Sequence, residues 1–309
     1  MYERIARIGM RSDKRIKIAF LGGDKRLATA VNRLAKEDYD VFVWRVPSCA
    51  ESENIRVSDT MYKAISGASA IILPLPSSSD GTSLNCMADD NESKTALTLI
   101  ADAIDQECVI IGGKIPKTFS DYAALNGIKT FDYFESEEFQ IKNAYTTAEA
   151  ALNIAMNNLS KNIRGSSFGI TGYGRISKQL AKLLLALGGR VTVAARKESD
   201  LAWAKLEGCE TIRLNGHGAI EKLCCGYDVI FNTVPSWLFD EHFLKNVSPN
   251  TLIVELASAP GGIDISEAKR LKSKVLWAAS LPGKYAPESA GELISECVSG
   301  IIAAEVRTK

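Results

Sequence analysis

A glycine-rich turn between two apolar segments is the part of this sequence best suited to chemistry. The turn reads Gly172-Tyr173-Gly174-Arg175-Ile176 and directly follows the apolar segment 168–171. Gly172 permits a tight turn out of a strand, and Gly174 has no side chain to hold a phosphate away from the backbone. The N–H groups of a helix that starts near Arg175 would then face that anion. The pattern predicts a dinucleotide-binding turn, in which Ser177 replaces the third small residue of the fingerprint.

The residues after the second strand of this motif indicate which dinucleotide binds. That strand is predicted over 191–195, and Arg196 and Lys197 follow it. A carboxylate at this place would accept a hydrogen bond from the ribose 2′-hydroxyl of NAD, whereas cations suit the 2′-phosphate of NADP. The two cations favour NADP. The alternative is that Arg196 is only a solvated loop residue.

Three later loops follow predicted strands and are expected to line the same cleft. In 232–236 the backbone would run beside the nicotinamide ribose, or would form only a proline turn. In 255–262, Glu255 would be a buried carboxylate that needs a partner. In 281–288, Lys284 is either a clamp for a carboxylate or a solvated residue. The residues predicted to contact the cofactor are Gly172, Tyr173, Gly174, Arg175, Ile176, Arg196, Lys197, Asn232, Thr233, Val234, Pro235, Ala257 and Pro282.

The elements that must hold these loops alternate between strand and helix along the chain. Strands are predicted before the turn at 16–21, 41–44, 70–75, 109–111 and 129–133, and after the second strand at 228–232, 252–256 and 275–278. Such alternation implies parallel sheets, whose ligands bind at the carboxyl ends of the strands. A helix over 146–160, with Thr146 or Thr147 as its N-cap, is predicted to link the two halves.

The sequence therefore predicts an α/β fold of two doubly wound parallel-sheet (Rossmann-like) domains of the formate/glycerate dehydrogenase type, joined by a long helix. Residues 1–144 would form the substrate domain, and residues 145–287 the NADP-binding domain with the linking helix. The C-terminal helix, 288–309, is expected to pack back near the first domain, because a connecting helix and a returning helix both flank the cleft in dehydrogenases of this type.

Composition limits the classes of partner. The 309 residues contain 37 Lys plus Arg and 37 Asp plus Glu, and this neutrality gives no support for binding to nucleic acid or to an anionic membrane. No apolar run approaches the length of a membrane span, and no signal peptide is visible. The seven cysteines are scattered, and with only two histidines they predict no metal site. We therefore expect free thiols in a reducing cytoplasm.

Six segments stand out when the chain is taken as a whole. They are Ile18-Ala19-Phe20-Leu21-Gly22-Gly23-Asp24, Ile71-Ile72-Leu73-Pro74-Leu75-Pro76, Gly172-Tyr173-Gly174-Arg175, Asn232-Thr233-Val234-Pro235-Ser236, Leu256-Ala257-Ser258-Ala259-Pro260-Gly261-Gly262 and Leu281-Pro282-Gly283-Lys284-Tyr285-Ala286-Pro287. In this order the chain resembles the family of dipicolinate synthase A subunits from endospore-forming bacteria. The resemblance covers residues 16–303. Its Gly-Gly-Asp, Pro-Gly-Gly and Leu-Pro-Gly segments are more specific than the glycine fingerprint, which many dehydrogenases share.

The resemblance implies a reaction, a partner and a setting. The reaction would be NADP-linked oxidation of a dihydrodipicolinate-level heterocyclic dicarboxylate to pyridine-2,6-dicarboxylate, in the mother cell during sporulation. The partner would be the flavoprotein-like dipicolinate synthase B subunit, and a homo-oligomer is expected as well. Ala259 departs from the expected pattern, because an Arg there would be a natural partner for a carboxylate. The cation that holds the substrate is therefore left open.

A dicarboxylate substrate needs cations and hydroxyls around it, and its oxidation needs a proton acceptor beside the reacting carbon. Asp24, at the exit of the first strand, is predicted as this base or as a water-orienting carboxylate, with a helix N-cap as the alternative. Lys284 is assigned to the catalytic group with Asp24, and Lys114 is a further candidate cation. Substrate contacts are predicted at Ser77, Ser78, Ser79, Thr146, Thr147 and Ser258.

Two other functions fit the same pattern. The first is an NADP-dependent oxidoreductase that acts on another small acid. The second is a non-catalytic NADP-binding scaffold for the B subunit.

Overall fold

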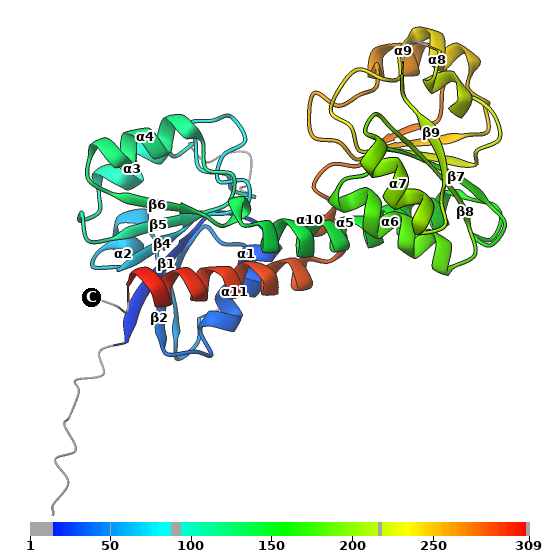
Figure 1. Ribbon diagram of the computed structural model, residues 1–309. Helices are drawn as coiled ribbons and strands as arrows, with labels where there is room; N and C mark the ends of the chain where they lie inside the picture. The colour runs from blue at the N-terminus through cyan, green and yellow to red at the C-terminus, as the bar shows by residue number, and fades with distance from the viewer. Residues whose placement is uncertain (1–14, 50, 88–93, 216–217, 307–309) are drawn as a thin grey trace, which may run out of the picture. The chain divides into compact units, whose positions relative to one another are not determined.

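The computed structural model describes residues 15–49, 51–87, 94–215 and 218–306 (Figure 1). These residues divide into two compact units. Unit 1 contains the described residues up to Ser136 and those from Gly291 onward, and unit 2 runs from Glu137 to Ala290. The predicted boundary after residue 144 falls inside the first helix of unit 2. Of the predicted C-terminal helix, residues 307–309 lie outside the described part.

Unit 1 is built on a six-stranded parallel sheet in the order β3-β2-β1-β4-β5-β6. Its strands are β1 (Ile16–Leu21), β2 (Tyr39–Trp44), β3 (Ile55–Val57), β4 (Ala70–Ile72), β5 (Val109–Gly112) and β6 (Lys129–Asp132). The order reverses between β1 and β4, which both leave the sheet at the same edge. In a doubly wound sheet this point leaves a crevice for ligands.

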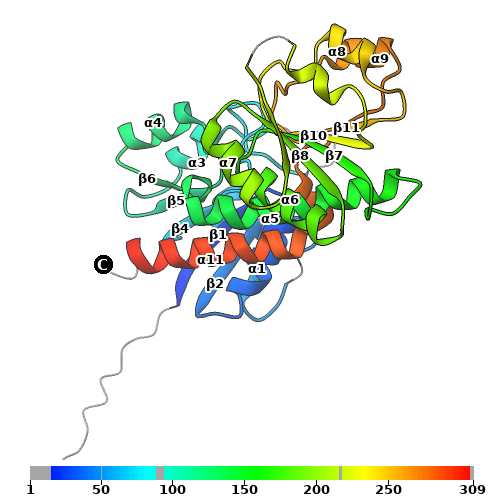
Figure 2. The ribbon, with the colours of Figure 1, turned by 45° about the vertical axis from the view of Figure 1, so that its right-hand side comes forward.

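Helices cover both faces of this sheet. They are α1 (Lys25–Leu34), α2 (Met61–Ile65), α3 (Leu97–Asp102), α4 (Lys117–Leu125), the 3-10 turn η1 (Tyr133–Glu135) and most of α11 (Pro287–Glu305). Helices α2, α3 and α4 enclose an apolar core with one face of the strands. Helices α1 and α11 lie side by side on the other face (Figures 1 and 2), where Arg33 of α1 pairs with Glu292 of α11 at 2.7 Å.

Unit 2 repeats the same strand order in a second parallel sheet, β12-β11-β10-β7-β8-β9. Its strands are β7 (Ser167–Thr171), β8 (Arg190–Ala195), β9 (Glu210–Arg213), β10 (Val229–Asn232), β11 (Leu252–Glu255) and β12 (Val275–Trp277). Its helices are α5 (Glu137–Asn158), α6 (Arg175–Ala186), α7 (Glu198–Leu206), η2 (Ile220–Leu223), α8 (Glu241–Asn246), α9 (Ile265–Arg270) and α10 (Leu281–Tyr285).

Two apolar cores hold unit 2 together. Side chains of α5, α6 and α7 pack on one face of the sheet, around Phe168 and Phe231. Side chains of α8, α9 and η2 pack on the other face, around Phe239 and Phe243. Helices α5 and α6 pack directly against each other. The predicted fold class, with its two doubly wound parallel sheets, is confirmed.

Several predicted element boundaries were wrong. Helix α5 begins at Glu137, so Thr146 and Thr147 lie inside it and cap nothing. The buried Phe139 and Ala144 extend its inner face, and two acidic residues suit its first turn. The segment predicted as a loop at 281–288 contains the short helix α10, with a proline in its first turn.

The strand predicted over 70–75 ends at Ile72, since Pro74 and Pro76 have no N–H to donate. The sequence analysis also missed β3 and β9. Both are short edge strands whose residues are mostly exposed, so they lack the apolar pattern that marks a buried strand.

Candidate functional site

The glycine turn after β7 has the geometry that its sequence predicts. Gly172 adopts φ +79°, and a Cβ there would lie 2.9 Å from both Thr233 Oγ1 and Val234 Cγ2. Gly174 is the N-cap of α6 and provides no side chain to accept from the first turn of the helix. A Cβ on Gly174 would meet open space. The turn therefore presents uncapped backbone N–H groups next to free volume, as an anion site requires.

The side chains of this turn point away from that volume. Tyr173 is buried and its hydroxyl donates to Glu207 at 2.8 Å, while burial raises the pKa of the phenol. Arg175 pairs with Glu137 of α5 at 2.6 Å. Of the five residues predicted here as cofactor contacts, Gly174 and Arg175 are exposed, Gly172 and Ile176 are half-buried, and Tyr173 is buried.

The surroundings of Ser177 explain why a serine fits at the third position of the fingerprint. The residue is fully buried, and its hydroxyl lies 2.8 Å from Thr233 Oγ1. Thr233 in turn donates to the carbonyl of Thr171 at 2.7 Å. A serine thus joins α6 to the loop after β10 without keeping the helix away from the sheet. The predicted cofactor contact Thr233 has its hydroxyl committed to this chain of hydrogen bonds.

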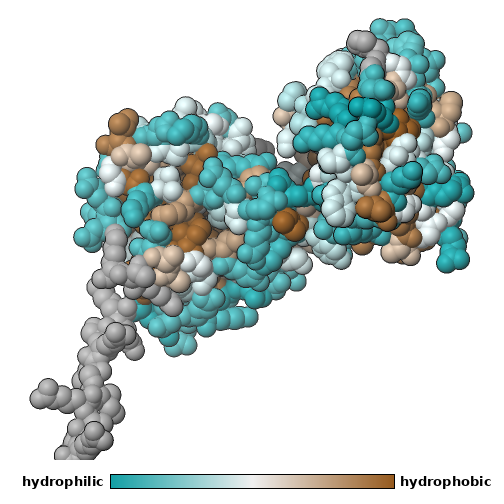
Figure 3. All heavy atoms as spheres, in the orientation of Figure 1, coloured by the Kyte–Doolittle hydropathy of each residue, from teal (hydrophilic) through white to brown (hydrophobic). Residues whose placement is uncertain are grey.

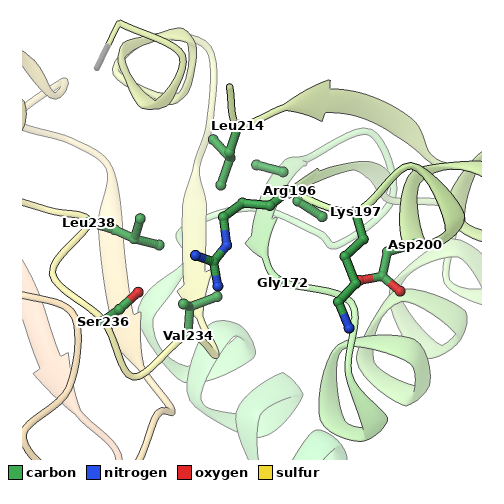
Figure 4. A pocket seen from close by; sticks show the side chains of 10 residues that line it. Gly172, Arg196, Lys197, Asp200, Leu214, Val234, Ser236 and Leu238 are labelled. Atoms are coloured by element: carbon green, nitrogen blue, oxygen red, sulfur yellow. The ribbon is translucent and has the colours of Figure 1, made fainter. Parts of the chain in front are cut away.

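A pocket at the carboxyl ends of β7, β8 and β10 contains several of the predicted cofactor contacts (Figure 4). Its lining residues are Gly172, Ala194, Ala195, Arg196, Lys197, Asp200, Leu214, Val234, Ser236 and Leu238. Arg196 extends toward Val234 and Ser236, whereas Lys197 lies on the side of Asp200. The structure thus brings the glycine turn, the two cations and Val234 together.

Both cations of this pocket are exposed, and neither forms a hydrogen bond or ion pair with a described residue. Their neighbour Arg213 differs, because it pairs with Glu198 at 2.6 Å. Two unpartnered cations beside a pocket that also contains uncapped N–H groups match the two anionic parts of NADP, its pyrophosphate and its 2′-phosphate. The residues present fit this cofactor.

A buried polar network fixes the loops after β10 and β11. Glu255 is fully buried, and Asn232 Nδ2 donates to its two oxygens at 2.9 and 2.8 Å. The backbone N–H groups of Ala257 and Gly262 donate to the same carboxylate, each at 2.9 Å. The sequence analysis expected a partner for the buried Glu255. Its partners are the side-chain amide of Asn232 and two backbone N–H groups. The carboxylate closes both ends of the 257–262 loop.

The other residues predicted to contact substrate or cofactor in unit 2 differ in exposure. Ser258 is exposed at the outer part of the 257–262 loop, and Ala257 is buried beneath it. Pro235 is exposed in the loop after β10. In α10, Pro282 is buried and Lys284 is exposed without a partner among the described residues. The substrate and cofactor roles of these residues stay predictions.

The serines predicted to contact the substrate follow β4 in unit 1. Ser77 is fully buried and its hydroxyl donates to the carbonyls of Pro74 and Gly113, at 3.2 and 3.1 Å. Ser78 donates to Asp80 at 3.1 Å, and Ser79 is exposed. The hydrogen bond from Lys94 holds the pKa of Asp80 well below its usual range. Ser77 thus connects the exits of β4 and β5, and only Ser79 has a fully exposed position.

The threonines of α5 and Lys114 have structural partners as well. Thr147 is buried and bonds to the carbonyl of Asn143 one turn earlier at 2.8 Å, whereas Thr146 is half-exposed. Lys114 follows β5, and its ammonium lies 4.6 Å from the centre of the Phe134 ring. These residues do not form one cluster within either unit.

Asp24 occupies the exit of β1, where it caps α1 by accepting from the N–H of Arg26 at 2.9 Å. Its carboxylate also pairs with the Arg26 guanidinium at 2.7 Å. The N-cap alternative is thus realised, and a role as base stays a prediction. Arg26 was missed by the sequence analysis, which gave it no role in the site. The spacing of two from a strand-exit aspartate is the signal that could have identified it.

The described residues contain no cluster of three or more His, Cys, Asp or Glu side chains that could hold a metal ion. None of the described helices combines the length and apolar character needed to cross a membrane. On the face shown in Figure 3, hydrophilic residues dominate the surface of each unit, with hydrophobic ones scattered among them.

Comparison with known proteins agrees with this geometry. Residues 17–134 match the family model for the N-terminal domain of the dipicolinate synthase A subunit. The A subunit of dipicolinate synthase from Bacillus subtilis is 27% identical over 292 residues, which are 93% of this chain and 96% of the relative. The chain is thus similar to a dipicolinate synthase A subunit over nearly the whole length of both proteins.

Solved structures extend this comparison. The A chain of dipicolinate synthase from Bacillus subtilis superposes with a TM-score of 0.82 at 26% identity, over 96% of this chain and 98% of that one. A D-3-phosphoglycerate dehydrogenase from Ralstonia solanacearum, named as a putative one, gives a TM-score of 0.56 at 14% identity, over 94% and 95% of the two chains. The chain thus shares its fold with these structures, and a fold of the dehydrogenase type was predicted.

Proposed function

We propose that this chain is the NADP-linked dehydrogenase subunit of a dipicolinate synthase. It would oxidise a dihydrodipicolinate-level heterocyclic dicarboxylate to pyridine-2,6-dicarboxylate in the mother cell during sporulation. The similarity to a dipicolinate synthase A subunit supports the product. NADP is proposed as the cofactor because Arg196 and Lys197 lie beside the glycine turn in one pocket. Both cations are without partners among the described residues.

The residues of unit 2 would divide the work of holding NADP. The N–H groups at the start of α6 would bind the pyrophosphate, and Arg196 with Lys197 would bind the 2′-phosphate. Leu214 and Leu238, which line the same pocket, would supply apolar contact to the adenine. The cofactor, when bound, accepts a hydride.

The network around Glu255 would set the geometry of the reactive end. Because the carboxylate bonds to the backbone at both ends of the 257–262 loop, that loop has a fixed shape before any ligand arrives. A preformed loop lowers the cost of aligning a substrate carbon with the nicotinamide. The ring would lose a hydride, which the bound cofactor would accept, and a proton, which a base or water would take, and it would become aromatic. Aromatisation itself favours the reaction.

The B subunit of dipicolinate synthase is the proposed protein partner, and a homo-oligomer is proposed with it. The name of the relative, which is the A subunit of its synthase, supports the existence of a second one. The dihydrodipicolinate-level compound would be oxidised in the presence of that partner.

The test is an absorbance assay for NADPH with the purified chain, the dihydrodipicolinate-level substrate and either NADP or NAD, with and without the B subunit. The proposal expects NADPH to form together with pyridine-2,6-dicarboxylate, and more slowly or not at all with NAD. Absence of turnover in the presence of the partner would refute it. Turnover of other small acids alone would favour a different oxidoreductase. Unchanged synthesis with a variant that cannot bind NADP would favour a scaffold.

A further inference from the structure

Arg26 connects two strand ends across the reversal point of the unit 1 sheet. Its Nε and Nη2 donate to Asp24, which follows β1, at 3.0 and 2.7 Å. Its Nη2 also donates to the carbonyl of Leu75, which follows β4. Strands β1 and β4 are the neighbours between which the strand order reverses. Arg26 therefore lies where a doubly wound sheet leaves a crevice for a ligand.

The guanidinium is held rigidly, but not all of its donors are used. Arg26 makes its hydrogen bonds through Nε and Nη2, and Nη1 donates to no described residue. Arg26 is not among the described residues that have an enclosed polar atom without a partner, and 9% of its side chain is exposed. Nη1 is thus open to solvent at one edge of an otherwise buried group.

A rigid guanidinium with a free edge is well suited to bind a carboxylate. The parallel Nε and Nη2 donors are used on Asp24, but Nη1 still has its N–H donors for a carboxylate oxygen, and the guanidinium does not lose its charge at any ordinary pH. Asp24 fixes its orientation in advance, so that little side-chain entropy is lost when the ligand binds. The other candidate cation of this sheet edge, Lys114, is a flexible point charge next to the Phe134 ring.

We propose that Arg26 binds one carboxylate of the substrate, and that Asp24 is the positioning residue that orients it. The proposal rests on the proposed function, since it names a residue that would hold the dicarboxylate.

The test measures binding of pyridine-2,6-dicarboxylate and of pyridine-2-carboxylate by calorimetry, with NADP present at saturation. The variants are R26Q, R26K and D24N, and the control is R33Q, which removes an exposed arginine of the same helix. R26Q is expected to weaken dicarboxylate binding roughly 10- to 100-fold, because one charge-assisted pair is lost. R26K and D24N should show intermediate losses, and R33Q should bind like the wild type.

A purely structural role is separated by the ratio of the two affinities. Loss of a carboxylate partner should reduce the wild-type preference for the dicarboxylate over the monocarboxylate, whereas a general loosening would weaken both alike. R26K keeps a charge beside Asp24 and so remains folded if R26Q does not, as circular dichroism will report. If folded R26K and R26Q kept the wild-type affinity and the wild-type preference for the dicarboxylate, the inference about Arg26 would be overturned. The proposed function would not be affected by that result. Failure of the wild-type chain to bind the dicarboxylate at all would overturn the proposed function with it.

Discussion

In unit 2, the charged residues at two strand ends have opposite roles. At the end of β8, Arg196 and Lys197 stand where an NAD-binding protein would have a carboxylate, and neither has a partner among the described residues. At the end of β11 the opposite holds, because the carboxylate of Glu255 is surrounded by donors and has no access to solvent. The first group is free to meet a ligand, and the second holds a loop in shape.

Replacement of Arg196 by alanine should change the cofactor preference. We expect R196A to bind NADP about 10-fold or more weakly, because a charge-assisted hydrogen bond to a phosphate contributes roughly 1.5–3 kcal/mol. Its affinity for NAD should remain within about twofold of the wild type on the same reasoning. Dissociation constants from fluorescence titration with NADPH and NADH measure both.

The matched control is R190A, at the opposite end of the same strand. Arg190 bonds to the Ser167 hydroxyl at 3.0 Å and lies outside the pocket. It should leave both affinities unchanged. If R196A lowered the affinities for NADPH and NADH equally, Arg196 would not bind the 2′-phosphate.

At the scale of elements, α1 and α11 pack so closely that there is no space for a side chain at one position of α11. A Cβ on Gly291 of α11 would lie 2.3 Å from the carbonyl oxygen of Arg26 and 2.5 Å from Thr29 Cβ. Gly300, further along α11, has nothing within 4 Å of an added Cβ. The same helix thus contains one glycine required by packing and one that is not.

These two glycines give a paired prediction for stability. G291A should destabilise the protein by about 1–3 kcal/mol, because overpacking forces α1 and α11 apart. G300A should stabilise it by roughly 0.5–1 kcal/mol, because alanine is the better helix residue in open space. Midpoints of urea unfolding compare the two variants directly. A stabilising G291A would mean that the helices do not pack as closely as described.

Element order could be predicted from the sequence, and element boundaries less well. The alternation of apolar strands with amphipathic helices was sufficient for the two parallel sheets. The start of α5 was placed too late, because Thr146 and Glu149 mimic a capping box, although Phe139 and Ala144 continue the buried face before them. Short edge strands such as β9 were not predicted, because their exposed residues form no apolar pattern.

The candidate site likewise has features that could be predicted from the sequence and features that could not. The backbone role of the glycine turn and the cations after β8 could be read from local spacing, because a strand, a turn and a helix are adjacent in sequence. Hydrogen-bond partners that are distant in the sequence could not be predicted. Arg26 meets the Leu75 carbonyl, and Asn232 meets Glu255, only after the sheets have brought their strand ends together.

For the whole molecule, the two units differ in how the chain builds them. Unit 2 is one continuous segment with its own two cores. Unit 1 needs residues on both sides of that segment, since Glu292 pairs with Arg33 and Ser299 donates to Glu37 at 3.1 Å. Independent folding is therefore expected of unit 2 alone.

A fragment of residues 137–290 tests this expectation. It should unfold cooperatively in urea and should bind NADPH with close to the affinity of the full chain, because its cores and the pocket are complete. It should not bind pyridine-2,6-dicarboxylate, for which the proposed cation Arg26 is absent. Circular dichroism and calorimetry follow the two properties. A fragment without cooperative unfolding would show that unit 2 depends on unit 1.

The insertion of unit 2 into unit 1 has a consequence on the ribosome. Synthesis proceeds from the N-terminus, and domains generally fold as they emerge. Strands β1 to β6 emerge first, yet their α1 face stays without α11 until the residues after Gly291 have been made. During that interval the inserted unit can acquire its structure, while the earlier-made sheet still exposes apolar surface. The nascent chain would then complete its second-made unit before its first.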